Sequence, residues 1–178
     1  MRPDQLTVKA QEALQAAQQE AERRHHPQLD VEHLLHALVR QRDGLIPSLL
    51  KKLGVSPDAL ATHLERELNR LPTVSGPTAQ LSLAPGLASL FEQAEREADG
   101  LKDDYISTEH LLLAAIESGG PAGSLLKAQG IHRDGLLKTL AELRGSQRVT
   151  DQNPEEKYQA LERYGRDLTA LPERVSVW

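Results

Sequence analysis

Apolar residues recur along most of this chain at steps of three and four positions, the spacing of a helix that buries one face. In the first segment the spacing is set by Val8, Ala10, Leu14, Ala17 and Ala21. It predicts a helix from about Thr7 to about Arg24, with the Thr7 hydroxyl as its cap. Pro27 ends this helix, because the residue before a proline avoids the helical conformation.

Three further helices are predicted in the first half of the chain. One begins after Asp30, one covers about residues 45–53, and one begins after Ser56 and ends before Pro72. Asp and Ser side chains accept hydrogen bonds from the free N–H groups of a first helical turn. Helices this short are marginal alone in water, so leucine side chains packed between them must supply the stability.

One stretch of the chain, residues 30–37, occurs a second time as residues 107–114. Glu32 of the first copy and Glu109 of the second lie 77 positions apart, and this offset holds over a long run without a gap. After a single deletion the offset becomes 76 for the rest of the second copy. Self-similarity at a fixed period predicts a duplicated structural unit.

The duplication predicts an all-α fold of two pseudo-symmetric four-helix units, followed by a linker helix. The helices of the second unit are predicted at about residues 85–99, 108–117, 121–129 and 133–144. A loop rich in Pro, Gly, Ser and Thr joins the units. The proposed domain is residues 1–145, with repeat one at about 1–72, the inter-repeat loop at 73–84, repeat two at about 85–145, and a linker segment at 146–178.

The linker segment has a different character from the repeats. Residues 145–156 are polar and rich in turn formers, and we expect them to bury nothing. A last helix is predicted from Pro154 to Leu171. One face of that helix would carry Tyr158, Leu161, Tyr164 and Leu168. We interpret the segment as an appendage that packs on another element or begins one.

Composition narrows the class of protein. The formal charge of −5, from 21 basic and 26 acidic residues, disfavours a nucleic-acid binder, which would carry a basic surface. The absence of cysteine fits a reducing compartment. The sequence contains no apolar run of about 18 residues and no apolar signal segment at its start. These features predict a soluble cytoplasmic protein.

Candidate catalytic and metal-binding residues are few. His33 and His36 share a helix face, but neither cysteine nor a convergent carboxylate completes a zinc site, and His25 and His26 are expected in solvent. Since His33 recurs as His110, we favour a role in packing or capping. Neither a Gly-x-Ser-x-Gly motif nor a phosphate-binding loop occurs, so we expect no enzyme activity, no ATP hydrolysis and no bound cofactor.

A peptide-binding surface is the better hypothesis. Two packed repeats leave a groove at their junction, and the space between helices is a common place for a binding site. An apolar groove with a polar rim suits unfolded polypeptide segments, because their exposed apolar side chains are stabilised by burial.

Short motifs at both ends of the chain resemble the ClpB-type disaggregases. The motifs near the start are Met1-Arg2, Asp4, Leu6-Thr7, Lys9, Gln11 and Ala13-Leu14, together with the doubled His-Leu-Leu helix, which resembles the Clp N-terminal repeat. Residues 68–72 resemble the junction between the repeats in that family. The motifs similar to the linker before the first ATPase ring are Asp151-Gln152, Ala160-Leu161, Tyr164 and Asp167-Leu168-Thr169.

The resemblance implies a double Clp N repeat and a function for it. The domain would recruit unfolded or aggregated polypeptides for ATP-driven threading, in protein refolding and the heat-stress response. ATP and magnesium would belong to the ATPase modules of the hexameric full-length family protein. The isolated domain is expected to be a monomer without nucleic-acid or membrane partners. The alternative is a docking domain for adaptor proteins, as in protease-linked Clp unfoldases.

The resemblance also implies a set of substrate-binding residues. Thr7, Asp103 and Glu109 match the positions of the family's substrate-contacting patch, and Tyr105 aligns beside them as an amphipathic contact. Each of the first three also has a structural interpretation, as a helix cap, a turn former and a first-turn carboxylate respectively. Both interpretations stay open at this point.

The end of the chain departs from the family pattern. The family continues into ATPase modules with phosphate-binding loops, and residues 172–178 do not follow its sequence. We interpret the chain either as a truncated N-terminal region or as a free-standing homologue.

Overall fold

The computed structural model describes residues 3–75, 80–145 and 147–158. These residues include the eight α-helices α1 to α8, a further helical stretch at 154–158, a single-turn 3₁₀ helix and two strands of two residues each. The elements in chain order are η1 (Pro3–Gln5), α1 (Val8–Arg23), β1 (Gln28–Leu29), α2 (Val31–Arg40), α3 (Leu45–Lys52), α4 (Pro57–Asn69), β2 (Ser82–Leu83), α5 (Pro85–Gly100), α6 (Thr108–Ile116), α7 (Pro121–Ala128) and α8 (Arg133–Arg144). The predicted all-α fold is confirmed.

The two halves of the molecule follow the same plan. The starts of α1 and α5 differ by 77 positions, as do those of α2 and α6, whereas the starts of α3 and α7, and of α4 and α8, differ by 76. Backbone conformation repeats as well. His25 and Lys102 both have a positive φ, and so do Gly54 and Gly130. Matching conformations at matching positions confirm the duplication.

Side chains at the helix starts explain where the central helices begin. Asp30 before α2 and Ser107 before α6 each form a capping box with the histidine three residues later. Nδ1 of His33 accepts a hydrogen bond from the Asp30 N–H at 3.0 Å, and Nδ1 of His110 accepts one from the Ser107 N–H at 2.8 Å. The capping role predicted for the repeated histidines is therefore confirmed.

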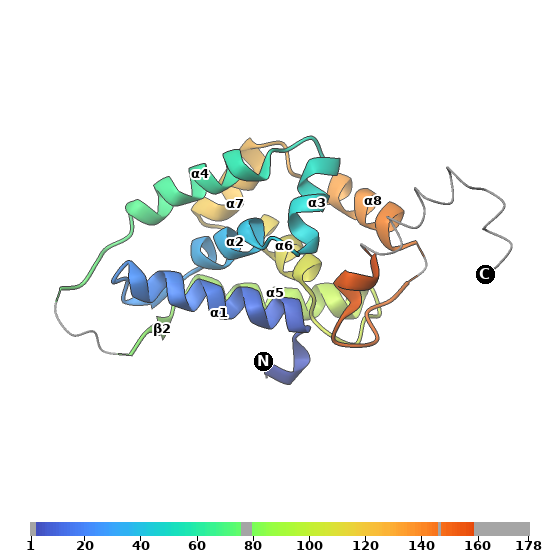
Figure 1. The fold of residues 1–178 in the computed structure, drawn as a ribbon, viewed down its shortest axis with the longest axis horizontal. Coiled ribbons are helices and arrows are strands. Elements are labelled where there is room, and N and C mark those ends of the chain that lie inside the picture. The colour runs from blue at the N-terminus through green and yellow to red at the C-terminus, as the bar shows by residue number, and fades with distance from the viewer. Residues whose placement is uncertain (1–2, 76–79, 146, 159–178) are drawn as a thin grey trace, which may run out of the picture.

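The helices are arranged around a central pair. In Figure 1, α2 and α6 lie between α1 and α5 on one side and α3, α4, α7 and α8 on the other. α2 packs against α1 and α4, and α6 packs against α5 and α7. Contacts between α2 and α6 join the two repeats into one body.

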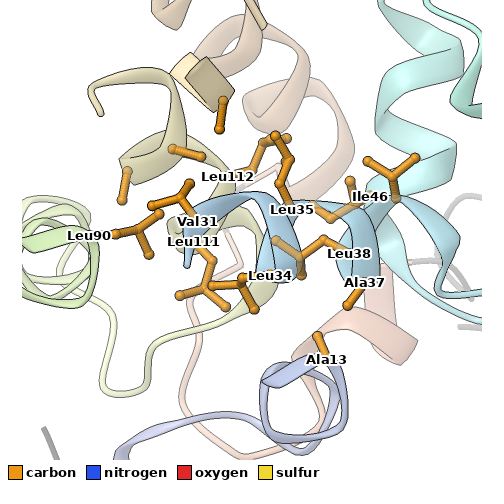
Figure 2. Close-up of a cluster of buried hydrophobic side chains, with 14 of the residues drawn as sticks. Ala13, Val31, Leu34, Leu35, Ala37, Leu38, Ile46, Leu90, Leu111 and Leu112 are labelled. Carbon is orange, nitrogen blue, oxygen red and sulfur yellow. The ribbon is translucent and has the colours of Figure 1, made fainter. Parts of the chain in front are cut away.

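The predicted leucine stripe of α2 lies at the centre of the core. Figure 2 shows Leu34, Leu35 and Leu38 of α2 together with Leu111 and Leu112 of α6, and all five are buried. They belong to one apolar cluster that includes side chains from both repeats. Burial of each leucine contributes about 1.5–3 kcal/mol, which is what holds these short helices together.

Short β contacts cross between the halves. β1 pairs in parallel with β2, matching Leu29 to Leu83, and an isolated parallel bridge joins Leu6 to Ile106. Leu6 and Leu83 are equivalent under the 77-residue offset, and so are Leu29 and Ile106. The segment before α1 therefore lies beside the start of α6, just as the segment before α5 lies beside the start of α2. The fold thus contains two sites of the same plan, each between two helix N-termini.

The stretch after α8 differs from what the sequence predicts. The expectation that residues 145–156 bury nothing is wrong, because Val149 and Glu155 are both 0% exposed. Residues 154–158 are helical, where the last helix was expected to begin, and the rest of that predicted helix lies outside the described residues. The proposed domain boundaries stay a prediction. We call residues 147–158 the strap.

Candidate functional site

The strap passes over the starts of α1 and α6, at the orange-to-red end of the described chain in Figure 1. Its main-chain hydrogen bonds to the domain include two with segments far away in the sequence. The Val8 N–H donates to the Gln152 carbonyl at 2.8 Å, and the Asp104 N–H donates to the Val149 carbonyl at 2.8 Å. The strap therefore adds to one of the two helix-terminus sites from outside the repeats.

Thr7 connects the start of α1 to the strap. Its Oγ1 accepts a hydrogen bond from the Ala10 N–H at 3.2 Å, so the predicted helix cap is confirmed. The same hydroxyl donates to Oε2 of Glu155 at 2.8 Å, and the Thr108 N–H donates to that oxygen at 3.1 Å. One buried carboxylate oxygen from the strap thus joins the starts of α1 and α6.

Asp103 is the acceptor at the centre of this site. Arg144 Nη2 donates to its Oδ1 at 2.6 Å, the Val149 N–H donates to the same oxygen at 2.9 Å, and His110 Nε2 lies 2.7 Å from Oδ2. Because Nδ1 of His110 accepts a hydrogen bond, Nε2 carries the proton of the neutral ring and donates it. Burial raises the pKa of Asp103, but these hydrogen bonds outweigh it and lower the pKa to about 2.

Glu109 lies in the first turn of α6, as its structural interpretation requires. Its side chain is fully buried and hydrogen-bonds with the Ser107 hydroxyl, while Arg144 Nη1 lies 3.9 Å from its Oε2. Burial raises the pKa of Glu109 to about 7, and the nearby Glu155 carboxylate acts in the same direction. Two buried carboxyl groups, one from the domain and one from the strap, therefore stand at the same helix start.

Tyr105 occupies the apolar side of the same region. It is half-buried and packs against a small cluster formed by Leu45, Leu143, Val149 and Tyr158. The guanidinium of Arg144 lies 5.5 Å from the centre of the Tyr158 ring. The two buried apolar residues of the strap therefore have partners on α3 and α8.

The structure brings all four predicted substrate-binding residues into one region. We call Thr7, Asp103, Thr108, Glu109 and Arg144 the strap socket. Thr7, Asp103 and Glu109 are at most 7% exposed, and each is held in the interactions described above. Their predicted contact with substrates stays a prediction, and it would require the strap to leave.

Sequence reasoning missed the residues that close the socket. Arg144 was interpreted only as the end of a helix, and Glu155 only as part of a polar linker. The available signal was Val149, an apolar residue that stands isolated in a polar stretch. A single apolar residue shows no periodicity, so a pattern search assigns it no partner. Tyr158 was assigned to the apolar face of the predicted last helix, without a partner on α3 or α8.

A recess lies at the junction of the two repeats, where the starts of α2, α5 and α7 meet. Its volume is about 520 Å³. Its apolar lining comes from Val31, Leu90, Ala114 and Ala122, and its first residues on α5 are Pro85 and Gly86. Val31 and Leu90 are visible at the edge of the core in Figure 2. We call this site the seam recess, and it matches the groove expected between the repeats.

Charged groups around the seam recess are mostly acidic. Asp30, Glu32 and Glu117 line it, and Arg96 is the basic residue among its lining side chains in the described part of the chain. Arg96 donates two hydrogen bonds to Oε1 of Gln93, the shorter at 2.8 Å. Burial raises the pKa of Glu32.

One of the two histidines expected in solvent is buried. His25 is exposed, as expected, whereas His26 is buried, and its Nδ1 lies 2.7 Å from Nε2 of His33. His36 lies instead near Glu65, at 3.7 Å. Within residues 3–75, 80–145 and 147–158, no group of three His, Cys, Asp or Glu side chains could hold a metal ion.

None of the described helices combines the length and the apolar character that a membrane crossing requires. The cytoplasmic location expected from the sequence stays a prediction.

Comparison with known proteins places this arrangement in a family. Residues 5–129 match the family described as the Clp repeat (R) N-terminal domain. The chaperone protein ClpB of Bacillus anthracis is 43% identical over 170 residues, which cover 94% of this chain and 20% of that relative. The chain thus spans about a fifth of the length of the curated relatives it matches.

Solved structures share the fold. The Hsp104 N-terminal domain from Candida albicans aligns with a TM-score of 0.75 at 23% identity, covering 84% of this chain and 98% of that one. A complex of the ClpV N-domain with a VipB peptide aligns with a TM-score of 0.61 at 22% identity, covering 77% and 85% of the two chains. At these identities the likeness concerns the fold alone.

Proposed function

Because this chain belongs to the Clp repeat (R) N-terminal domain family, we propose that it recruits unfolded or aggregated polypeptides to a ClpB-type disaggregase. The observation that carries the proposal is the seam recess. It is an open site at the repeat junction, lined by both apolar and polar residues. Such a site gains by covering the apolar side chains that unfolded chains expose.

In this proposal, ATP-driven threading of the captured chain is carried out by other parts of a longer protein. The sequence has no phosphate-binding loop, so ATP, magnesium and the threading step would belong to ATPase modules of a hexameric relative of ClpB. The relatives that match this chain are about five times its length, which leaves room for such modules. The chain itself would act by binding alone, without a cofactor.

Weak binding suits this role. An unfolded ligand loses conformational entropy when it is ordered, which lowers the affinity gained from each contact. A recess of this size covers only a short part of a long client. A domain that must pass its client onward needs rapid release, and release dominates differences in affinity.

The proposal is tested by titrating the 178-residue protein with an unfolded test protein and with the same protein in its folded state, using fluorescence anisotropy. We expect saturable binding of the unfolded form alone. Ser89→Trp should weaken it, because Ser89 is an exposed residue of α5 that lines the recess. Ala88→Trp is the matched control, because Ala88 is exposed on the same helix and does not line the recess.

The adaptor-docking alternative makes the opposite forecast. Saturable binding of a folded adaptor protein, with no response to unfolded chains, would overturn the proposed function. Equal weakening by Ser89→Trp and Ala88→Trp would place the binding site elsewhere on the domain.

A further inference from the structure

The seam recess overlaps the repeat-one equivalent of the strap socket. Ala84, Val31 and Glu32, which line it, are the equivalents of Thr7, Thr108 and Glu109. The equivalents of Asp103 and Arg144, His26 and Leu68, are not among its lining residues. The socket lies where the start of α1 meets the start of α6, beside the bridge between Leu6 and Ile106. The recess lies where the start of α5 meets the start of α2, beside the pairing of Leu83 with Leu29. The socket is filled by the strap, so it shows how a polypeptide segment is held at a site of this plan.

Two differences remove the groups that hold the strap. The equivalent of Thr7 is Ala84, which lacks the hydroxyl that donates to Glu155. The equivalent of Val8 is Pro85, which lacks the N–H that donates to the strap. An acidic side chain like that of Glu155 would therefore find fewer hydrogen-bond donors in the recess.

A third difference leaves a buried carboxyl group without a cation. Glu32 is the equivalent of Glu109, but Arg144, which lies 3.9 Å from Glu109, is replaced by Leu68. Glu32 lines the recess and is 4% exposed, and its Oε2, like that of Glu109, has no hydrogen-bond partner among the described residues. Glu109 has the Arg144 guanidinium nearby, whereas Leu68 offers Glu32 no charge. A buried carboxylate oxygen without a partner is costly, so a cationic group that reached Glu32 would be favoured.

The remaining backbone donor at this helix start is already occupied. The Val31 N–H, equivalent to the Thr108 N–H that donates to Glu155, donates to Oδ1 of Asp30 at 2.7 Å. Asp30 and Glu117 add further negative charge around the recess. The charges of the site therefore complement a basic ligand and oppose an acidic one.

We propose that the seam recess binds a segment of unfolded polypeptide in which a lysine or arginine stands next to an apolar side chain. The cation pairs with Glu32 from the side of the recess, and the apolar side chain packs on Val31, Leu90 and Ala122. The proposal rests on the proposed function and specifies the substrate class of the same site.

The test uses the 178-residue protein and three short, unstructured, fluorescent peptides. The peptides share one apolar core and differ at a single flanking position, which is Lys, Gln or Glu. Fluorescence anisotropy gives the three dissociation constants. We expect the Lys peptide to bind about tenfold more tightly than the Glu peptide, the size of effect that a hydrogen bond to a charged group provides.

Two variants locate the effect. Glu32→Gln should abolish the preference for Lys over Gln, whereas Glu92→Gln, which removes an exposed carboxylate of α5 outside the recess, should retain it. Ser89→Trp should weaken all three peptides, because it fills the recess from an exposed position. Circular dichroism checks that each variant is folded, and Ser89→Trp keeps the test decisive if Glu32→Gln does not fold.

Different results would overturn the basic-segment proposal and the proposed function on which it rests. Binding of all three peptides with equal affinity, or a Lys preference that survives Glu32→Gln, would overturn the basic-segment proposal and leave recruitment of unfolded chains standing. Failure of the protein to bind any peptide or unfolded protein would overturn both.

Discussion

The strap socket and the seam recess are two versions of one duplicated arrangement, and they differ in their side chains. Both lie between the start of a long outer helix and the start of a central helix. The site at the start of α6 is rich in paired polar groups and is closed by the strap. The site at the start of α2 is open, and the charged groups around it are mostly acidic. The backbone is repeated, and a few side chains distinguish the closed site from the proposed binding site.

The socket also contains the substrate-binding residues that the resemblance implies. Thr7, Asp103 and Glu109 all hold the strap or its neighbours. Their contact with substrates stays a prediction, and it would require the strap to leave. The following experiments test whether the two sites differ as described.

The largest effect is expected for Asp103→Ala. This change leaves the buried Arg144 guanidinium without its nearest carboxylate, and breaking a buried pair costs about 3–5 kcal/mol of unfolding free energy. Urea denaturation measures the loss. The equivalent change in repeat one, His26→Ala, removes only a neutral acceptor of His33 and should cost about 1–3 kcal/mol. Equal losses would mean that the socket is no more tightly held than its counterpart.

The next effect is a pH dependence that belongs to the socket. Glu109, whose pKa is raised from 4.5 to about 7, holds a proton in the folded protein that the unfolded chain releases at lower pH. The unfolding free energy therefore falls as pH rises from 4.5 to about 7. Arg144 and His110 oppose this shift, and Glu155 adds to it.

Denaturation curves measured between pH 4.5 and about 7 give the slope of the unfolding free energy against pH. Glu109 contributes at most about 1.4 kcal/mol per pH unit, and Glu109→Gln should reduce the slope by removing this contribution. A variant with the wild-type slope would show that Glu109 does not titrate between its unfolded and folded values. Asp103 acts in the opposite sense, because its lowered pKa contributes stability that is lost only as pH falls toward about 2.

The smallest effect concerns the caps. Thr7→Ala removes both a helix cap and a donor to the buried Glu155, so we expect a loss of about 2 kcal/mol. Ser56→Ala removes a cap alone, at the exposed start of α4, and should cost about 1 kcal/mol. Thermal or urea unfolding compares the two. If Thr7→Ala lowers the unfolding free energy no more than Ser56→Ala does, the hydrogen bond to the strap adds no stability at this position.

Much of the fold could be predicted from the sequence because helix starts and buried helix faces depend on residues that are close together in the chain. Helix starts were predicted from capping residues such as Asp30 and Ser56. The duplication was predicted from the constant 77-residue spacing between matching residues. Burial of the α2 leucines follows from their spacing. These features depend on residues a few positions apart, where sequence patterns are reliable.

The closed socket could not be predicted because its contacts span the chain. Thr7 and Glu155 are 148 positions apart, and Asp103 and Val149 are 46 apart. The strap carries no helical or strand periodicity until residue 154, so nothing in its own sequence indicates where it packs. The acidic character of the recess was missed for a related reason, since Glu32 and Glu117 come together only in the folded protein.

The most direct test of the account is to locate a bound unfolded chain on the domain. An unfolded test protein carrying a spin label broadens the NMR signals of residues near it in the 178-residue protein. We expect broadening at Ser89 and Gly120, which line the seam recess, while the amides of Val8 and Val149 at the strap remain sharp. Broadening at Val8 and Val149 with an unaffected recess would contradict the account and make the strap socket the binding site.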